Sequence, residues 1–205
     1  MKIELDHIGR RFNREWIFRN ISCSFEQGKA YAILGPNGSG KSTLLQVIAG
    51  SLSPSEGAIS WLNNSLKVDD ELVFQHLSIA TPYLELVEEL TLTELINFHF
   101  NFKKFKEGLN TKAIIEVLGF EKSKNKAIKY FSSGMKQRTK LALAFCSDTP
   151  VLLLDEPTAN FDHQGIDWYN GLVKEFTSNR LVIVCSNQEH EYEFCSGQVL
   201  ISDYK

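Results

Sequence analysis

GPNGSGKS, residues 35–42, is the stretch of sequence that decides the fold. It matches the pattern G-x-x-x-x-G-K-[ST], in which glycines let backbone N–H groups turn inward around phosphate oxygens. Lys41 adds a fixed positive charge for the β- and γ-phosphates, and the Ser42 hydroxyl suits Mg²⁺. The residues predicted to bind nucleotide here are Gly35, Pro36, Asn37, Gly38, Ser39, Gly40, Lys41, Ser42 and Thr43.

The surroundings of this loop separate two interpretations of it. A plain Gly/Ser turn between a strand and a helix is the simpler one. However, the apolar run 29–34 before the loop predicts a strand, and KSTLLQVIAG at 41–50 has helical periodicity and stops at a glycine. Because the phosphate-binding motif requires a strand before it and a helix after it, the context favours nucleotide binding.

A second segment, VLLLDEPTANFD at 151–162, has four aliphatic residues followed by two carboxylates. In an open parallel sheet, ligands bind at the carboxyl ends of the strands. Asp155 is therefore placed to orient Mg²⁺ or its waters, and Glu156 to polarise an attacking water. A strand that merely ends in solvated acids is the alternative, and the accompanying phosphate loop makes it the weaker one.

The rest of the chain predicts an α/β fold. Residues 3–34 alternate short apolar runs with polar breaks, and RLVIVCS at 180–186 and GQVLIS at 197–202 are further strands. Between them, apolar residues three and four apart predict helices at 91–105, 111–120 and 133–145. Thr91 and Glu94 form a candidate capping box for the first of these helices. The pattern indicates a mostly parallel sheet with an inserted helical region.

Bulk composition excludes several classes of protein. The net charge of −3 gives no chain-wide positive field, so we expect no nucleic-acid partner. The four cysteines form no CxxC pair and indicate buried thiols in a reducing, cytosolic compartment. The amino terminus has charges where a signal peptide needs an apolar run, and no segment has the roughly 18 apolar residues of a spanning helix. We expect the chain itself to be soluble.

Four segments together resemble the ATP-binding cassette (ABC) family in order and spacing, over nearly the whole chain: GPNGSGKSTLL, SPSEGAI, SSGMKQRTKLALA and LLLDEPTANFD. The resemblance implies a single domain with the P-loop nucleoside triphosphate hydrolase fold. Its α/β core would comprise residues 1–83 and 148–205, including an N-terminal antiparallel β portion. A helical subdomain would occupy 84–147. ATP and Mg²⁺ are the implied cofactors, and ATP hydrolysis is the implied reaction.

The family's signature segment, usually LSGGQ, corresponds to residues 131–135, with Met135 departing from the usual glutamine. The resemblance implies that Ser132, Ser133, Gly134 and Met135 meet the γ-phosphate of ATP held by a second ABC subunit. It also implies that Asn160 and Asp162 contact this subunit. Both features predict an ATP-dependent, head-to-tail homo- or heterodimer. Without the family, the first segment is a serine-capped helix and the second a polar turn.

Aromatic residues occupy two family positions. Phe12 lies where the family places an adenine-stacking aromatic, although Trp16 is an alternative and an ordinary core aromatic is the simpler interpretation. Tyr83 replaces the glutamine that follows the strand entering the helical subdomain, since LTLTEL fixes the register. Gln75 lies too far upstream for this position. The replacement implies a Mg²⁺ shell without that amide oxygen and an altered coupling contact.

Asn187 stands where the family has a switch histidine. An asparagine amide donates a hydrogen bond to the γ-phosphate but cannot take up a proton. We therefore expect slow hydrolysis with Glu156 as the catalytic carboxylate and Asn187 beside it. His190, three residues further on, is interpreted as a surface helix residue rather than a displaced switch.

The resemblance implies a membrane-spanning permease subunit as the partner that this chain energises, with export as the direction. The chain would then be cytoplasmic and peripheral on the inner face of the membrane. A soluble ABC ATPase without a transporter, or a weakly hydrolysing ATP-gated module suggested by Tyr83 and Asn187, remain the alternatives. The helical region is rich in lysine between 103 and 129, which fits either an acidic partner or a solvated face.

Overall fold

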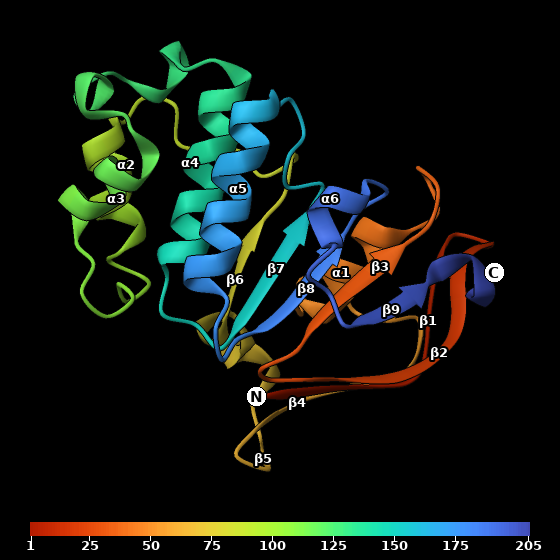
Figure 1. The fold of residues 1–205 in the computed structure, drawn as a ribbon. Coiled ribbons are helices and arrows are strands. Elements are labelled where there is room, and N and C mark those ends of the chain that lie inside the picture. The colour runs from red at the N-terminus through yellow and green to blue at the C-terminus, as the bar shows by residue number, and fades with distance from the viewer.

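Two β-sheets form the framework of the computed structural model, which describes residues 1–205 (Figure 1). Four strands pair antiparallel in the order β2-β1-β4-β5, and five pair in parallel in the order β6-β7-β8-β3-β9. The predicted α/β fold with an N-terminal antiparallel portion is confirmed. The antiparallel strands are β1 (Lys2–Phe12), β2 (Glu15–Glu26), β4 (Glu56–Asn63) and β5 (Leu66–Lys67).

The parallel sheet is the centre of the molecule. Its strands are β3 (Ala30–Leu34), β6 (Leu77–Ala80), β7 (Val151–Asp155), β8 (Leu181–Cys185) and β9 (Gly197–Leu200). Every residue of β7 and β8 is buried. This is why both strands are continuous aliphatic runs in the sequence rather than alternating ones, since side chains leave both faces of the sheet into apolar surroundings.

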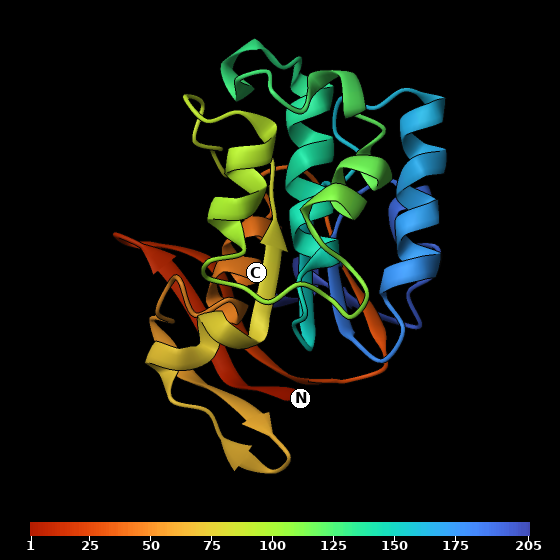
Figure 2. The same ribbon diagram turned by 90° about the vertical axis from the view of Figure 1, so that its left-hand side faces the viewer.

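Six α-helices pack around the parallel sheet. They are α1 (Lys41–Ile48), α2 (Leu92–His99), α3 (Thr111–Leu118), α4 (Ser133–Cys146), α5 (His163–Phe176) and α6 (Glu189–Tyr192). Short 3₁₀ segments occur at Asp70–His76, Glu121–Ser123, Ile128–Tyr130 and Ile201–Tyr204. Figures 1 and 2 show α2 to α5 gathered at the end of the molecule away from the antiparallel sheet.

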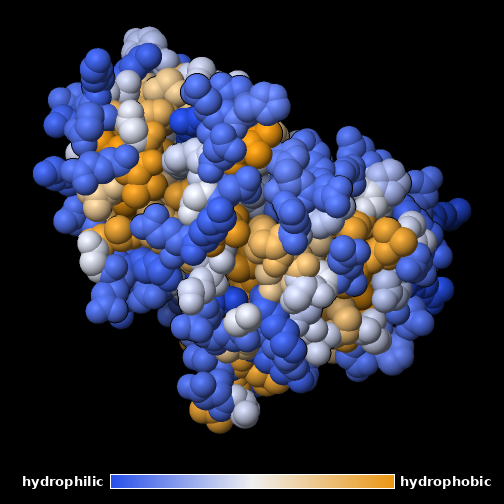
Figure 3. Space-filling view, in the orientation of Figure 1, coloured by the Kyte–Doolittle hydropathy of each residue, from blue (hydrophilic) through white to orange (hydrophobic).

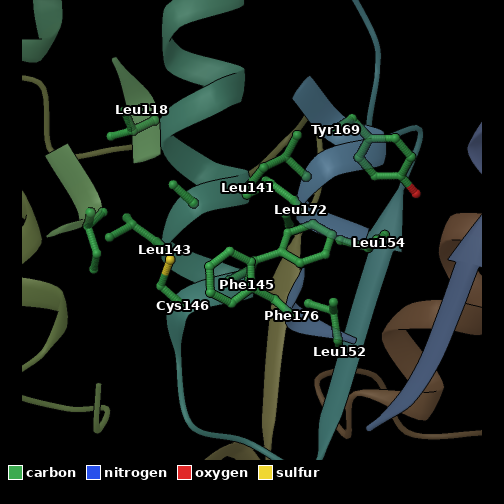
Figure 4. Close-up of a cluster of buried hydrophobic side chains, with 14 of the residues drawn as sticks. Leu118, Leu141, Leu143, Phe145, Cys146, Leu152, Leu154, Tyr169, Leu172 and Phe176 are labelled. Carbon is green, nitrogen blue, oxygen red and sulfur yellow. The ribbon is translucent and has the colours of Figure 1, made fainter. Parts of the chain in front are cut away.

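The hydrophobic core divides along the parallel sheet. Leu152 and Leu154 of β7 point into a cluster with α2 to α5, whose centre is shown in Figure 4. Val151 and Leu153, the alternate residues of the same strand, belong to a second cluster with α1 and the antiparallel sheet. The parallel sheet therefore separates two hydrophobic clusters. One packs against the helical region, and the other packs against α1, which follows the phosphate loop.

The first inserted helix is shorter than its pattern predicts. The capping box of Thr91 and Glu94 is confirmed, but α2 ends at His99 rather than continuing to residue 105. The chain folds back there, because the rings of Phe100 and Phe105 stack with centroids 3.8 Å apart. The Lys106 N–H then bonds the Cys146 carbonyl at the end of α4. Aromatic packing has overridden the helical period.

The cysteines only partly match the expectation of burial. Cys146 and Cys185 are fully buried, whereas Cys23 and Cys195 are half-buried, and all four thiols are free. Burial raises the pKa of Cys23 to about 11 and that of Cys195 to about 12. None of the four therefore has the character of a reactive thiolate.

Candidate functional site

The phosphate loop joins the end of β3 to the start of α1. Gly35, Gly38 and Gly40 all have positive φ, of 152°, 75° and 106°. At Gly40 the close approach of β2 is a second constraint, because an added Cβ would lie 2.4 Å from Ile17 Cγ2. The Lys41 ammonium is folded back into the loop and donates to the carbonyl oxygens of Gly35 (2.7 Å) and Pro36 (3.3 Å). The loop thus curls around its own cation.

Asp155, the last residue of β7, is the most constrained acid of the site. It is 2% exposed, and its Oδ1 has no hydrogen-bond partner. Burial raises the pKa of this carboxyl, a hydrogen bond with Ser42 and the charge of Lys41 lower it, and the neighbouring carboxylates Glu156 and Glu191 raise it further. A cation at the free oxygen would compensate the burial of this acid.

The residues present fit Mg²⁺. Ser42 and Asp155 supply a hydroxyl and a carboxylate, the oxygen ligands that this ion prefers, and Mg²⁺ commonly completes its shell with substrate phosphates and water. No group of three or more His, Cys, Asp or Glu side chains that could hold a metal ion occurs in the chain.

Glu156 follows Asp155 directly and has an uncommon backbone. Its φ is +42°, in the left-handed region, and its N–H bonds the Cys185 carbonyl of β8 at 2.9 Å. Its side chain lines a cavity of about 330 Å³, hereafter the Lys41 cavity. The lining residues are Ile17, Asn37, Gly38, Gly40, Lys41, Ser42, Thr43, Tyr83 and Glu156. The loop and the carboxylate predicted from separate segments thus meet in one cavity.

Asn187 reaches the same loop from β8. Its Nδ2 donates to Asn37 Oδ1 at 2.7 Å, which brings it to the edge of the Lys41 cavity. His190, by contrast, lies on α6 and its Nε2 contacts the Thr158 hydroxyl at 3.0 Å. The helical position expected for His190 is confirmed, and the side chain facing the phosphate loop is Asn187.

Tyr83 also lies at the Lys41 cavity, as its register predicts. It is 78% exposed, so its ring has room to move toward or away from a ligand. Gln75 lies in the 3₁₀ segment before β6 and is not part of the cavity lining.

The β1–β2 hairpin carries the aromatic candidates without bringing either into the cavity lining. Phe12 is 46% exposed, with the Arg10 guanidinium 4.6 Å from its ring centroid. Trp16 has the guanidinium groups of Arg11 and Arg19 within 5.4 and 4.5 Å of its ring centroid. The residue of this hairpin that does line the Lys41 cavity is Ile17, which the sequence analysis did not single out.

A separate pocket of about 370 Å³, hereafter the Ser132 pocket, contains the signature segment. It is lined by Phe120, Ser132, Ser133, Gly134, Met135, Arg138, Asn160, Phe161 and Asp162. Ser132 caps α4, because its hydroxyl accepts from the Met135 N–H at 3.2 Å. Asp162 caps α5 through the Gly165 N–H at 2.8 Å. The two segments predicted to face a second subunit therefore form one surface.

Three buried polar residues near the site escaped the sequence analysis. Gln137 on α4 donates to the Pro157 carbonyl at 3.0 Å and so connects the signature helix to the loop after Glu156. Thr158 and Glu191 bond one another between β7 and α6. Each is a single polar residue within an ordinary helical or turn segment, so no local pattern could have found them.

The sequence of this chain is similar to those of known ATP-binding proteins. The model of the ABC transporter family matches residues 18–159, more than half of the chain. The chain belongs to the ABC transporter ATP-binding family. The Streptococcus pyogenes lantibiotic transport ATP-binding protein SrtF is 27% identical over 195 residues, covering 90% of this chain and 79% of its own. The Bacillus subtilis linearmycin resistance ATP-binding protein LnrL is 29% identical over 206 residues, covering 98% and 66%.

Other relatives of this cassette are much longer. The chain spans 22% of the Dictyostelium discoideum ABC transporter A family member 7, at 26% identity. Among solved structures, a putative ABC transporter ATP-binding protein from Pyrococcus furiosus superposes with a TM-score of 0.83 at 20% identity and full coverage of both chains. The cassette MJ0796, in a dimeric post-hydrolysis state bound to ADP and Pi, gives 0.80 at 21% identity, covering 97% of this chain and 94% of its own. No helix of the chain is long and apolar enough to cross a bilayer.

Proposed function

We propose that this cassette is the ATP-binding and ATP-hydrolysing subunit of an ABC exporter, working on a separately encoded membrane-spanning permease subunit. One observation carries the proposal: Lys41, Ser42 and Glu156 line one cavity at the carboxyl ends of the parallel strands. A cation, a hydroxyl and a carboxylate are the groups that hold a triphosphate and activate water.

Each side chain has a defined task in this proposal. Lys41 exchanges its two loop carbonyls for the β- and γ-phosphates, and the N–H groups of the loop bind the oxygens around it. Ser42 and Asp155 would hold Mg²⁺, which would supply neutralisation of the phosphate charge when bound. Glu156 accepts the proton of the attacking water. Asn187 exchanges Asn37 for the terminal phosphate and supplies a neutral hydrogen bond.

A second cassette completes the site. At the Ser132 pocket the N–H groups of Ser133 and Gly134 have no acceptor within the helix, because the first turn of a helix leaves its donors free. Together with Met135, they would face the γ-phosphate held by the other subunit, with Asn160 and Asp162 as dimer contacts. Phe12 would stack on the adenine. The ADP-bound dimer of MJ0796, which shares this fold, supports such an assembly.

An apolar groove supports the permease as partner. It has a volume of about 390 Å³ and lies between the 3₁₀ segment Asp70–His76, the chain after β6, and helices α2 and α4. Its rim exposes large side chains, among them Phe74 (54%), Phe98 (46%) and Phe102 (68%). The hydropathy surface shows apolar patches over the helical region and at the lower tip, where Figure 1 places β5 (Figure 3).

Two of the three charged residues that line this groove are the cations Lys103 and Lys140, and the third is Glu85. Lys103 donates only to the carbonyls of Phe74 and Leu77, and Lys140 only to those of Thr81 and Pro82. Burial lowers the pKa of both lysines, and neither forms a salt bridge. A short amphipathic helix of the permease, apolar on one face and carrying a carboxylate, would fill the groove and pair with these cations. The chain would thereby be held at the inner face of the membrane.

Export is the direction favoured by the names of two relatives. SrtF is a lantibiotic transport protein and LnrL a linearmycin resistance protein, and resistance conferred by a transporter follows from outward movement of the compound. The alternative of a weakly hydrolysing ATP-gated module is supported only by Asn187 and Tyr83 at the cavity.

Phosphate release from the purified chain with ATP and Mg²⁺ tests the proposal. We expect measurable turnover that chelation of Mg²⁺ abolishes, and a loss of about 100-fold or more in Glu156→Gln, since a positioned base contributes 10²–10⁴-fold. Glu193→Gln, an exposed acid after α6, is the control and should retain full turnover. ATP binding without turnover in the unmodified chain, with or without a permease, would favour the ATP-gated module.

A further inference from the structure

Glu191 is a completely buried acid without a cation partner. It lies on α6, is 0% exposed, and forms no salt bridge. Its carboxylate is satisfied by hydrogen bonds alone: Oε1 accepts from the Thr158 N–H at 2.7 Å and from the Thr158 hydroxyl, and Oε2 accepts from the Ser186 hydroxyl. A buried carboxylate is costly unless donors are fixed around it, so these contacts are strongly coupled to the fold.

The donors come from two loops of the proposed active site. Thr158 lies two residues after Glu156, in the loop that leaves β7, and Ser186 immediately precedes Asn187, in the loop that leaves β8. In Figure 1 the end of β7 lies beside α6. One carboxylate therefore ties the loop of the catalytic acid to the loop of the residue that reaches the phosphate loop.

The loop after β7 needs such a tie. Glu156 adopts a left-handed backbone, φ +42°, which is unfavourable for a residue with a side chain and persists only where the surroundings fix it. The turn closes through the Ala159 N–H and the Glu156 carbonyl at 3.1 Å. Thr158, inside this turn, has its N–H directed to Glu191. The bond thus restrains the segment whose conformation sets the direction of the Glu156 side chain.

Glu191 is itself anchored in the core. Its backbone carbonyl accepts from the Tyr169 hydroxyl at 2.8 Å, and Tyr169 on α5 is completely buried. The backbone that carries the carboxylate is thus tied to the buried helix α5, as a positioning residue requires.

We propose that Glu191 is a positioning residue for ATP hydrolysis, which holds the Glu156 turn and the Asn187 loop in one arrangement through the Thr158 and Ser186 bonds. The inference rests on the proposed function. It assigns Glu191 no contact with ATP or Mg²⁺, so its loss should lower kcat and leave nucleotide binding nearly unchanged.

The test compares the full-length chain with Glu191→Ala, Glu191→Gln and the exposed control Glu193→Ala, by phosphate release per folded molecule and by amide hydrogen exchange. We expect Glu191→Ala to lower kcat by about 10- to 100-fold, as misplacement of a reacting group does, with KM within about 3-fold. Exchange should rise at 156–160 and at 186–188 together. Glu191→Gln should restore most of the turnover, because its amide oxygen still accepts from Thr158 and its NH₂ can donate to Ser186.

Three results would overturn the inference: kcat of Glu191→Ala within about 2-fold of the unmodified chain, equal losses in the Gln and Ala variants, or faster exchange confined to α6. If Glu191→Ala does not fold, Thr158→Val and Ser186→Ala remove the two hydroxyl donors singly. Each should then lower kcat at unchanged KM, and normal kcat in both would overturn the inference. If the unmodified chain shows no turnover, the proposed hydrolytic function and a role of Glu191 in hydrolysis both fail, while the exchange pattern still shows whether Glu191 restrains the two loops.

Discussion

The Lys41 cavity and the Ser132 pocket differ in the groups that they offer to a nucleotide. The first combines a cation and a hydroxyl at the start of α1, after β3, with a carboxylate that directly follows β7. The second offers helix N–H groups, one guanidinium and polar turn residues, and shares no lining residue with the first. In the proposed function, the first surface holds and hydrolyses ATP, and the second covers the ATP held by another chain.

The caps of the Ser132 pocket sharpen this contrast. The Ser132 oxygen and one oxygen of Asp162 already accept N–H groups of their own helices. The Ser132 O–H can still donate, and together with the positive end of α4 and the Arg138 guanidinium it suits an anion brought by another molecule. Directly before Glu156 of the Lys41 cavity, by contrast, the buried carboxyl of Asp155 keeps an unpartnered oxygen. The Ser132 pocket therefore offers donors to an anion, whereas Asp155 offers an acceptor to a cation.

The largest expected effect comes from removing the cation of the Lys41 cavity. Lys41→Ala should weaken ATP binding by about 100-fold or more, because charge-assisted bonds to two phosphates are lost at 1.5–3 kcal/mol each. Lys29→Ala removes a lysine whose side chain is 56% exposed and paired with Glu26, and serves as the control. Titration calorimetry with ATP and Mg²⁺ measures both. Equal affinities of the two variants for ATP would contradict the assignment of residues 35–42 as the loop that binds its phosphates.

A smaller effect, of opposite sign for two variants, is expected at Asn187. Asn187→His should raise turnover by about ten- to a hundredfold, since it replaces a neutral hydrogen bond by a charge-assisted one. Asn187→Ala should lower turnover, because the donor is lost altogether. Steady-state phosphate release under saturating ATP distinguishes them. Identical changes in both variants would mean that Asn187 acts only through Asn37.

The smallest effect is on stability. The pKa of Asp155 is raised by burial, so the native state disfavours the ionised acid. Stability is therefore lost as the pH rises above the ordinary value of 3.8 and through the raised pKa, and the penalty is fully present above that pKa. Asp155→Asn should raise the melting temperature of the nucleotide-free chain, by about 2–4 °C for each kcal/mol regained, while abolishing hydrolysis.

Thermal unfolding without ATP and Mg²⁺, beside the exposed control Asp167→Asn, checks this prediction. An unchanged or lower melting temperature in Asp155→Asn alone would show that the ionised carboxyl is stabilised by the free protein. Asp155 would then not be an unsatisfied acid that distinguishes the Lys41 cavity from the Ser132 pocket.

The sequence was sufficient for the parts of the site that depend on local chemistry. The aliphatic runs predicted β3, β7 and β8, and the glycine pattern predicted the loop, because backbone conformation and strand burial act on neighbouring residues. The register of LTLTEL correctly brought Tyr83 rather than Gln75 to the cavity. The role of Phe12, the signature contacts and the division at residues 83 and 147 stay predictions.

What the sequence could not provide depends on residues distant along the chain. Glu191 bonds Thr158 across 33 positions, and Gln137 bonds Pro157 across 20, without any periodic signal in either segment. The early end of α2 has the same cause. Phe100 stacks on Phe105, and the spacing of apolar residues along a helix does not predict this contact. Tertiary contacts decided these features.

The central claim, that the Ser132 pocket of one chain completes the Lys41 cavity of another, is tested most directly by the mass of Glu156→Gln in solution. With saturating ATP and Mg²⁺, we expect sedimentation to show a dimer, and a monomer when nucleotide is absent or when Ser132→Arg is added. A Glu156→Gln chain that binds ATP and stays monomeric, or that dimerises equally with Ser132→Arg, would contradict the claim.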